Sequence, residues 1–199
     1  MGKFIFCEGK DDVLVIQELL KSLSSKLSLD IHVEEFCGKD NLRNFLSDAL
    51  KRPEFSQKKV ETIAIVRDAD NDGNSAFQSV LGSLNDVGFQ NCPSKPGIFS
   101  GMNPKIGVFI VASKDNRGAI EDLCLETVKT NPQFSCVDEY FRCVAEKSEK
   151  KSFSSKARVR VWMAGQKDFE LFVGKAALEG YWDWNHQTFD SLKNFLKQV

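Results

Sequence analysis

Apolar residues follow two alternating patterns along the first two thirds of the chain. Four short apolar runs have the length and flanking residues of buried strands; they cover residues 3–7, 29–36, 60–66 and 105–112. After each run, apolar residues recur every three or four positions, as on one face of a helix; these stripes cover residues 13–23, 42–50, 76–84 and 119–124. Repeated strand–helix order predicts a mainly parallel, doubly wound α/β sheet flanked by helices. Asp12 is the expected N-cap of the first helix.

The pattern changes beyond about residue 130. Apolar residues from Phe141 to Ala145 and again at 189–195 have helical spacing, and the segment between them, 146–160, is polar and rich in Lys and Arg. We therefore expect two parts: an α/β domain over residues 1–130, and a helical C-terminal extension over residues 131–199 that packs on it.

Composition narrows the class of protein. Lys and Arg number 27 and Asp and Glu 28, a net charge of −1, so any surface that binds nucleic acid must be a local patch. No apolar run approaches the roughly 18 residues of a membrane helix, so we expect no membrane association. The six cysteines include no C-x-x-C pair, which favours reduced core cysteines in a cytoplasmic protein.

Acidic residues follow two of the predicted strands. Glu8 follows the first strand, and Asp68, Asp70 and Asp72 follow the third. Loops after the carboxyl ends of parallel strands form the ligand crevice of such a sheet. Several carboxylates in one crevice cannot all ionise without a cation, and oxygen ligands favour Mg²⁺ or Mn²⁺. The alternative is a solvated acidic turn, since Asp, Asn and Gly are common turn residues.

Two other motifs partly match the Asp-rich loop. The order Asp68-x-Asp70-x-Asp72 begins an EF-hand loop, but position twelve is Ser79 instead of Glu and a strand precedes it. An Asp-x-Asp after a strand also resembles the haloacid-dehalogenase-like phosphatases. Those usually carry Thr or Val where Asp72 stands, and their nucleophile tends to follow the first strand, which here carries Glu8. The phosphatase is kept as an alternative.

The combination of Glu8-Gly9 with Asp68-Ala69-Asp70 resembles the TOPRIM domain of topoisomerases, bacterial primases, ribosomal-RNA maturases and OLD-family nucleases. The resemblance covers about residues 3–125 and is closest to stand-alone TOPRIM-like proteins of unassigned role and to the TOPRIM part of OLD-type nucleases. It implies that Glu8, Asp68 and Asp70 bind Mg²⁺ or Mn²⁺ and catalyse phosphotransfer on DNA or RNA. Asp72 is expected to be an auxiliary ligand.

The departures from that family narrow the activity. Topoisomerases need a transferable Tyr, and Tyr140 and Tyr181 lie outside the matching part. Primases need a zinc-binding region, which the sequence lacks. A nuclease needs only metal and a positioned water. Because the chain has no Walker A motif, the OLD resemblance leaves open a partner ATPase; a homo-oligomer also remains open. The alternative is a catalytically weak TOPRIM-fold module that binds nucleic acid or a partner.

Further polar candidates have two interpretations each. Glu121 and its neighbour Asp122 begin a helix, where acids either add a metal ligand or complement the helix dipole. Lys39 and Lys167 are candidates for the basic residue that OLD-type sites place near the scissile phosphate, or are surface lysines. The basic stretch 147–160 either tracks a phosphate backbone or is a solvated face. The aromatic residues within 180–184 either stack bases or pack the tail on the core.

Overall fold

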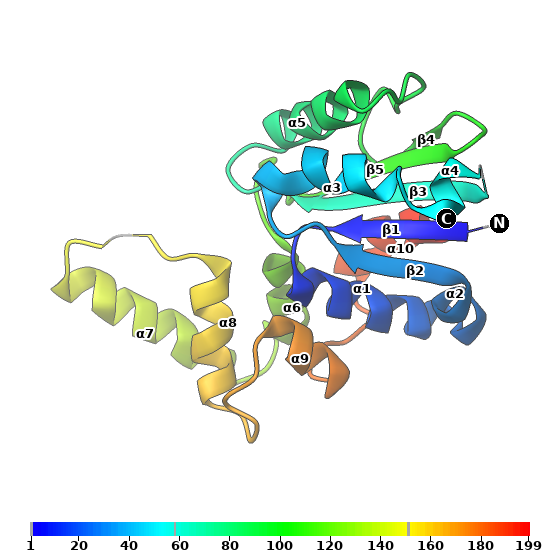
Figure 1. The fold of residues 1–199 in the computed structure, drawn as a ribbon. Coiled ribbons are helices and arrows are strands. Elements are labelled where there is room, and N and C mark those ends of the chain that lie inside the picture. The colour runs from blue at the N-terminus through cyan, green and yellow to red at the C-terminus, as the bar shows by residue number, and fades with distance from the viewer. Residues whose placement is uncertain (1, 58, 151) are drawn as a thin grey trace.

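The computed structural model describes residues 2–57, 59–150 and 152–199. Its centre is a five-stranded sheet in the order β2-β1-β3-β5-β4 (Figure 1). The strands are β1 (Gly2–Cys7), β2 (Ile31–Glu35), β3 (Val60–Asp68), β4 (Phe99–Ser100) and β5 (Lys105–Val111). The four predicted strands, β1, β2, β3 and β5, pair in parallel, and the short β4 is antiparallel to β5. The predicted α/β fold with a mainly parallel sheet is therefore confirmed.

Helices cover both faces of the sheet. They are α1 (Lys10–Leu23), α2 (Ser25–Asp30), α3 (Leu42–Ala49), α4 (Pro53–Ser56), α5 (Gly73–Asp86), α6 (Ile120–Val128), α7 (Phe134–Lys147), α8 (Ser155–Ala164), α9 (Val173–Leu178) and α10 (Asp190–Leu196), with 3-10 turns η1 (Lys39–Asn41) and η2 (Gln187–Phe189). One core cluster joins the sheet to α3 and α5, and the other joins its opposite face to α1, α6, α9 and α10 (Figure 1).

The central strand β3 forms because its β-branched and small residues fit between two helical layers. Successive side chains of a strand point to opposite faces. Ala64 and Val66 belong to the cluster beneath α1, whereas Ile63 and Ile65 belong to the cluster beneath α3 and α5. All four are almost fully buried, so β3 anchors both layers and fixes where its carboxyl end lies.

Residues 131–199 share the core on the α1 side. Gly174 in α9 approaches α1 so closely that a Cβ atom there would lie 2.8 Å from the Cα atom of Asp11. Phe195 of α10 stacks on Phe99, with ring centroids 4.7 Å apart, and also contacts Phe109. The pair α7 and α8 extends away from the sheet (Figure 1), with α8 contacting α6.

Several local expectations were wrong. Gly9, not Asp12, is the N-cap of α1. Helix α8 begins at Ser155, inside the basic stretch 146–160 for which no helix was predicted; Lys151 of that stretch lies outside the described residues.

The cysteines also depart from the expectation. All six are free, but only Cys7 and Cys124 are buried, whereas Cys37, Cys136 and Cys143 are exposed. Core packing therefore explains two of them only. In the described parts of the chain, no helix is long and apolar enough to span a bilayer.

A candidate metal centre at the switch point of the sheet

The order of the strands creates a crevice between β1 and β3. The connection through α1 leaves β1 toward β2 on one face, and the connection through α5 leaves β3 toward β5 on the other. Ligands bind at such a reversal, outside the carboxyl ends of the strands. Cys7 at the end of β1 pairs with Val66 of β3. Glu8 and Asp68, which follow these two positions, therefore emerge at the same edge.

Asp68 is a buried carboxylate at this edge. Its side chain is 8% exposed, and its Oδ1 atom accepts a hydrogen bond of 3.0 Å from the backbone N–H of Ile120 at the start of α6. Burial, and then the charges of Asp12, Glu121 and Glu8, raise the pKa of Asp68 well above its usual value. These four carboxylates are thus close enough to oppose one another's ionisation.

Glu8 reaches the crevice from the end of β1. Its Oε2 atom is buried and has no hydrogen-bond partner among the described residues. The nearest cation is Arg67, whose Nε atom lies 3.7 Å from Oε2. This Nε atom is also buried, and it has no hydrogen-bond acceptor among the described residues. Burial raises the pKa of Glu8, Arg67 opposes that rise, and Asp70 adds to it. The carboxylate is therefore poised to accept either a proton or another cation.

Asp12 joins the cluster from the first turn of α1. Its Oδ2 atom accepts a 2.8 Å hydrogen bond from the backbone N–H of Gly9. Burial, reinforced by the charges of Glu121 and Glu8 and opposed by the Gly9 hydrogen bond, raises the pKa of Asp12 to about 7. An acid in a first helical turn usually only stabilises the helix, so nothing in the sequence pattern indicates that this one belongs to the site.

Glu121 and Asp122 have different roles. Glu121 is 3% exposed; its Oε2 atom has no hydrogen-bond partner within the described chain, and Lys156 Nζ lies 3.8 Å from its Oε1 atom. Burial raises the pKa of Glu121. Asp122 instead accepts hydrogen bonds from the backbone N–H of Ala119, at 2.8 Å, and from the Ser155 hydroxyl. Glu121 is thus the member of the pair that faces the acidic cluster.

Asp70 lies at the rim of the crevice with an uncommon backbone conformation. Its φ angle is +51°, a left-handed region that Asp tolerates better than most residues. Two backbone hydrogen bonds with Gly118, of 2.9 and 3.0 Å, hold it there. Its Oδ2 atom accepts a 3.2 Å hydrogen bond from Lys39, and both side chains are about half exposed. Lys39 therefore stands beside the predicted metal ligands.

The carboxylate of Asp72 forms hydrogen bonds outside the acidic cluster. Its carboxylate accepts hydrogen bonds from the backbone N–H of Asn74, the hydroxyl of Ser75 and the side-chain amide of Asn116, at 3.0, 2.6 and 2.9 Å. It is the N-cap of α5, and these hydrogen bonds lower its pKa. The auxiliary role expected of it is therefore not part of our proposal.

A cavity of about 660 Å³ opens over part of the cluster, and Glu8 and Asp12 are not in its lining. Asp68, Asp70 and Glu121 line it together with Lys39 and Lys156. Lys156 is held by the charge of Glu121, which raises the pKa of the lysine. Carboxylates and ammonium groups thus face one space. Lys167, the other predicted basic residue, is exposed beyond the end of α8 and lies outside the cavity lining.

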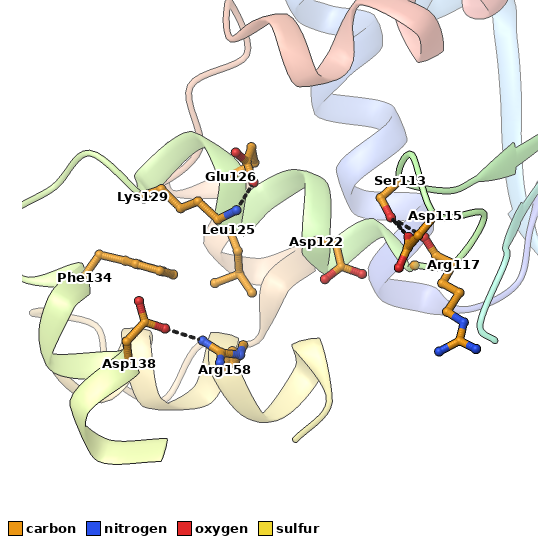
Figure 2. A pocket seen from close by; sticks show the side chains of 11 residues that line it. Ser113, Asp115, Arg117, Asp122, Leu125, Glu126, Lys129, Phe134, Asp138 and Arg158 are labelled. Carbon is orange, nitrogen blue, oxygen red and sulfur yellow. Dashed lines mark hydrogen bonds and ion pairs between the residues drawn. The ribbon is translucent and has the colours of Figure 1, made fainter. Parts of the chain in front are cut away.

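A neighbouring cavity of about 670 Å³ shares Arg117 and Asp122 with the first (Figure 2). Its own charges are largely paired. Figure 2 shows Arg158 reaching Asp138, with a 2.6 Å ion pair, and Lys129 reaching Glu126. Arg158 of the predicted basic stretch is therefore committed to a contact between α7 and α8.

The aromatic residues of the tail pack on the core. Trp182 is 3% exposed, and its indole N–H donates to the Val173 carbonyl at 3.0 Å. The Tyr181 hydroxyl donates to Asp168 at 2.8 Å, and Trp184 contacts Phe189. Of the two interpretations of segment 180–184, packing is the one that the contacts support.

The donor atoms are chemically suited to Mg²⁺ or Mn²⁺, but they are not arranged as a complete coordination shell. Within the described residues, no group of three or more His, Cys, Asp or Glu side chains is placed to hold a metal ion. However, all the converging side chains offer oxygen, the donor that these ions prefer. The buried Oε2 atoms of Glu8 and Glu121 lack hydrogen-bond donors, and a cation would satisfy both. Binding of a metal ion would require the side chains of these carboxylates to rotate.

The fold and the acidic crevice define an α/β protein with a candidate cation site at its switch point. A family model described as "Protein of unknown function (DUF3226)" matches residues 2–199, so the chain belongs to this family. No curated protein and no solved structure matches it.

Proposed function

We propose that this chain is a TOPRIM-like, metal-dependent nuclease or related phosphotransfer enzyme that acts on nucleic acid. One observation carries the proposal: Glu8, Asp12, Asp68 and Glu121 approach one another from four separate elements, so that burial and the charges of the other three raise the pKa of Asp68, and burial and the charges of Glu121 and Glu8 raise the pKa of Asp12. Gathering four acids, of which Asp68 and Glu121 are buried, without enough cations destabilises a fold. Such an arrangement is typical of sites where function outweighs stability.

The residues of the site would have different roles in catalysis. Asp68 and Asp70 would hold the cation, with Glu8 and Glu121 as further ligands or, for Glu8, as the general acid or base. When bound, Mg²⁺ or Mn²⁺ supplies charge neutralisation at a phosphoryl oxygen. Burial raises the pKa of Glu8 above its ordinary value, which suits a carboxyl group that exchanges a proton with the reacting oxygen. Lys39 offers its ammonium group to the phosphate from the rim.

The test is metal-dependent cleavage. Labelled single- and double-stranded DNA and RNA are incubated with the full chain while Mg²⁺ or Mn²⁺ is titrated. Glu8→Gln, Asp68→Asn and Asp70→Asn should each reduce turnover by about two orders of magnitude or more, while melting temperatures show that the fold survives. The matched control is Glu61→Gln, exposed at the opposite end of β3, which should cleave like wild type.

Three outcomes separate the alternatives. Metal-dependent cleavage by wild type that the three variants lose supports the proposal. Binding of nucleic acid without cleavage at any metal concentration would favour the binding module instead. Hydrolysis of small phosphomonoesters in place of nucleic acid would favour the phosphatase, for which Asp68 would be the nucleophile; its burial and its hydrogen bond to Ile120 argue against that role.

A further inference from the structure

We propose that a smaller cavity beside the acidic cluster is a subsite for one unstacked nucleobase, with Phe172 as its stacking surface. This inference rests on the proposed function and adds to it a substrate class, single-stranded nucleic acid. The cavity measures about 340 Å³, near the lower end of small-ligand pockets. Its walls include Lys156, Val159 and Arg160 of α8, and Phe172 before α9.

Phe172 is an exposed aromatic ring on a fixed backbone. The residue is 50% exposed. Its carbonyl accepts a 2.8 Å hydrogen bond from the N–H of Ala176 in α9. The next residue, Val173, is buried and its carbonyl accepts the hydrogen bond from the Trp182 indole. A base stacked on Phe172 would therefore meet a preorganised surface, which keeps the entropic cost of binding low.

Arg160 adds a charge to this surface. Its guanidinium lies 5.3 Å from the centroid of the Phe172 ring, a favourable cation–π distance. None of the ion pairs found in the described residues involves Arg160. Because no carboxylate of the described residues pairs with it, the guanidinium is available to a phosphate or a base carbonyl. An aromatic ring with a neighbouring Arg is a combination that binds single strands through stacking and cation–π contacts.

The subsite is continuous with the acidic cavity. Glu121 and Lys156 line both spaces. Lys156 and Arg160 are four residues apart on α8, so they lie on the same face of that helix. A strand whose phosphate lies over the carboxylates would place a neighbouring base beside Phe172. A duplex would have to flip that base out at a cost of a few kcal/mol, so the geometry favours a single strand.

The experiment measures binding by the full chain with fluorescein-labelled 15-nucleotide dT and rU strands and a matching duplex. Anisotropy is followed in Ca²⁺, which offers the cluster an oxygen-binding cation. Phe172→Ala should weaken single-strand binding about 10-fold. Phe172→Trp should retain it, and its added indole emission should be quenched by the bound strand. The control is Phe169→Ala: Phe169 is 62% exposed but lies outside the cavity lining, so its removal should leave binding unchanged.

Failure of this inference can be distinguished from failure of the proposed function. If Phe172→Ala binds like Phe169→Ala and Phe172→Trp shows no quenching, while wild type still cleaves with Mg²⁺, the subsite is wrong and the proposed function stands. If the duplex binds as tightly as the single strand, the single-strand preference is wrong. If wild type neither binds nor cleaves any of the strands, the proposed function fails, and the subsite fails with it.

Discussion

Asp12 keeps its proton up to about neutral pH, whereas most aspartates in proteins are ionised there. The cause is burial next to Glu121 and Glu8, which raises its pKa to about 7, whereas an Asp in an unfolded chain titrates near 3.9. Between these values the folded state binds the extra proton. The free energy of unfolding should therefore fall as pH rises from about 4 to about 7, and level off above that.

Asp12→Asn removes this dependence, because an amide resembles the protonated acid in shape and keeps an acceptor for the Gly9 N–H. In EDTA at pH 8 the variant should be more stable than wild type by roughly 4 kcal/mol, the free-energy equivalent of a pKa raised from 3.9 to about 7, and the gain should vanish near pH 4. Urea unfolding at several pH values measures this. Glu61→Gln is the control, and a gain that stayed constant with pH would contradict the explanation.

The contact between α9 and α1 depends on a residue without a side chain. A Cβ atom at Gly174 would lie 2.6 Å from Asp11 Oδ1 and 2.8 Å from its Cα, so Gly174→Ala must push the two helices apart. We expect a loss of about 1–3 kcal/mol, measured by thermal or urea unfolding.

A second glycine provides the opposite case. Gly82 lies in α5, and a Cβ atom there would have no neighbour within 4 Å. Gly82→Ala should therefore stabilise the protein by roughly 0.5–1 kcal/mol through the helix propensity of alanine. If both substitutions changed the stability in the same direction, the close approach of α9 to α1 would not be the cause of the Gly174 effect.

Most elements that the sequence predicted are long enough to show a period, although the ten-residue helix α8 was not predicted. Strands β1, β2, β3 and β5 and helices α1, α3, α5 and α6 follow from apolar spacing. Helices α2 and α4 and strand β4 were not predicted because they contain six, four and two residues, fewer than a pattern needs.

The site was partly predictable for a related reason. Glu8, Asp68 and Asp70 were found because they follow strands, and strand ends converge in any parallel sheet. Whether Glu121 or Asp122 faces the cluster depends on how α6 docks, since neighbouring helical residues point about 100° apart. Asp12 and Phe172 depend on the packing of α1 and α9, residues far apart in the chain. Local sequence carries no record of such contacts.

At the scale of the whole molecule, the core on the α1 side draws on both ends of the chain. Val15, Ile16 and Leu19 of α1 pack in one cluster with residues of α9 and α10, among them Ala177 and Leu196. A fragment ending at residue 130 would expose this apolar face to water. We expect it to melt without a cooperative transition and to bind a hydrophobic dye, measured by calorimetry and fluorescence. A sharp transition from the fragment would show that residues 1–130 fold alone.

This arrangement has a consequence for how the protein is made in a cell. Synthesis delivers the N-terminal segment first, so β1, α1 and the carboxylates that they carry leave the ribosome long before α9 and α10 exist to cover them. During that interval one side of the nascent sheet stays open to unwanted association. The apolar face of α1 is covered by α9 and α10 only when residues 173–196 emerge. A ribosome that stalls before that point would hold a chain in which all the acidic residues of the crevice are present but this apolar face is still exposed to water.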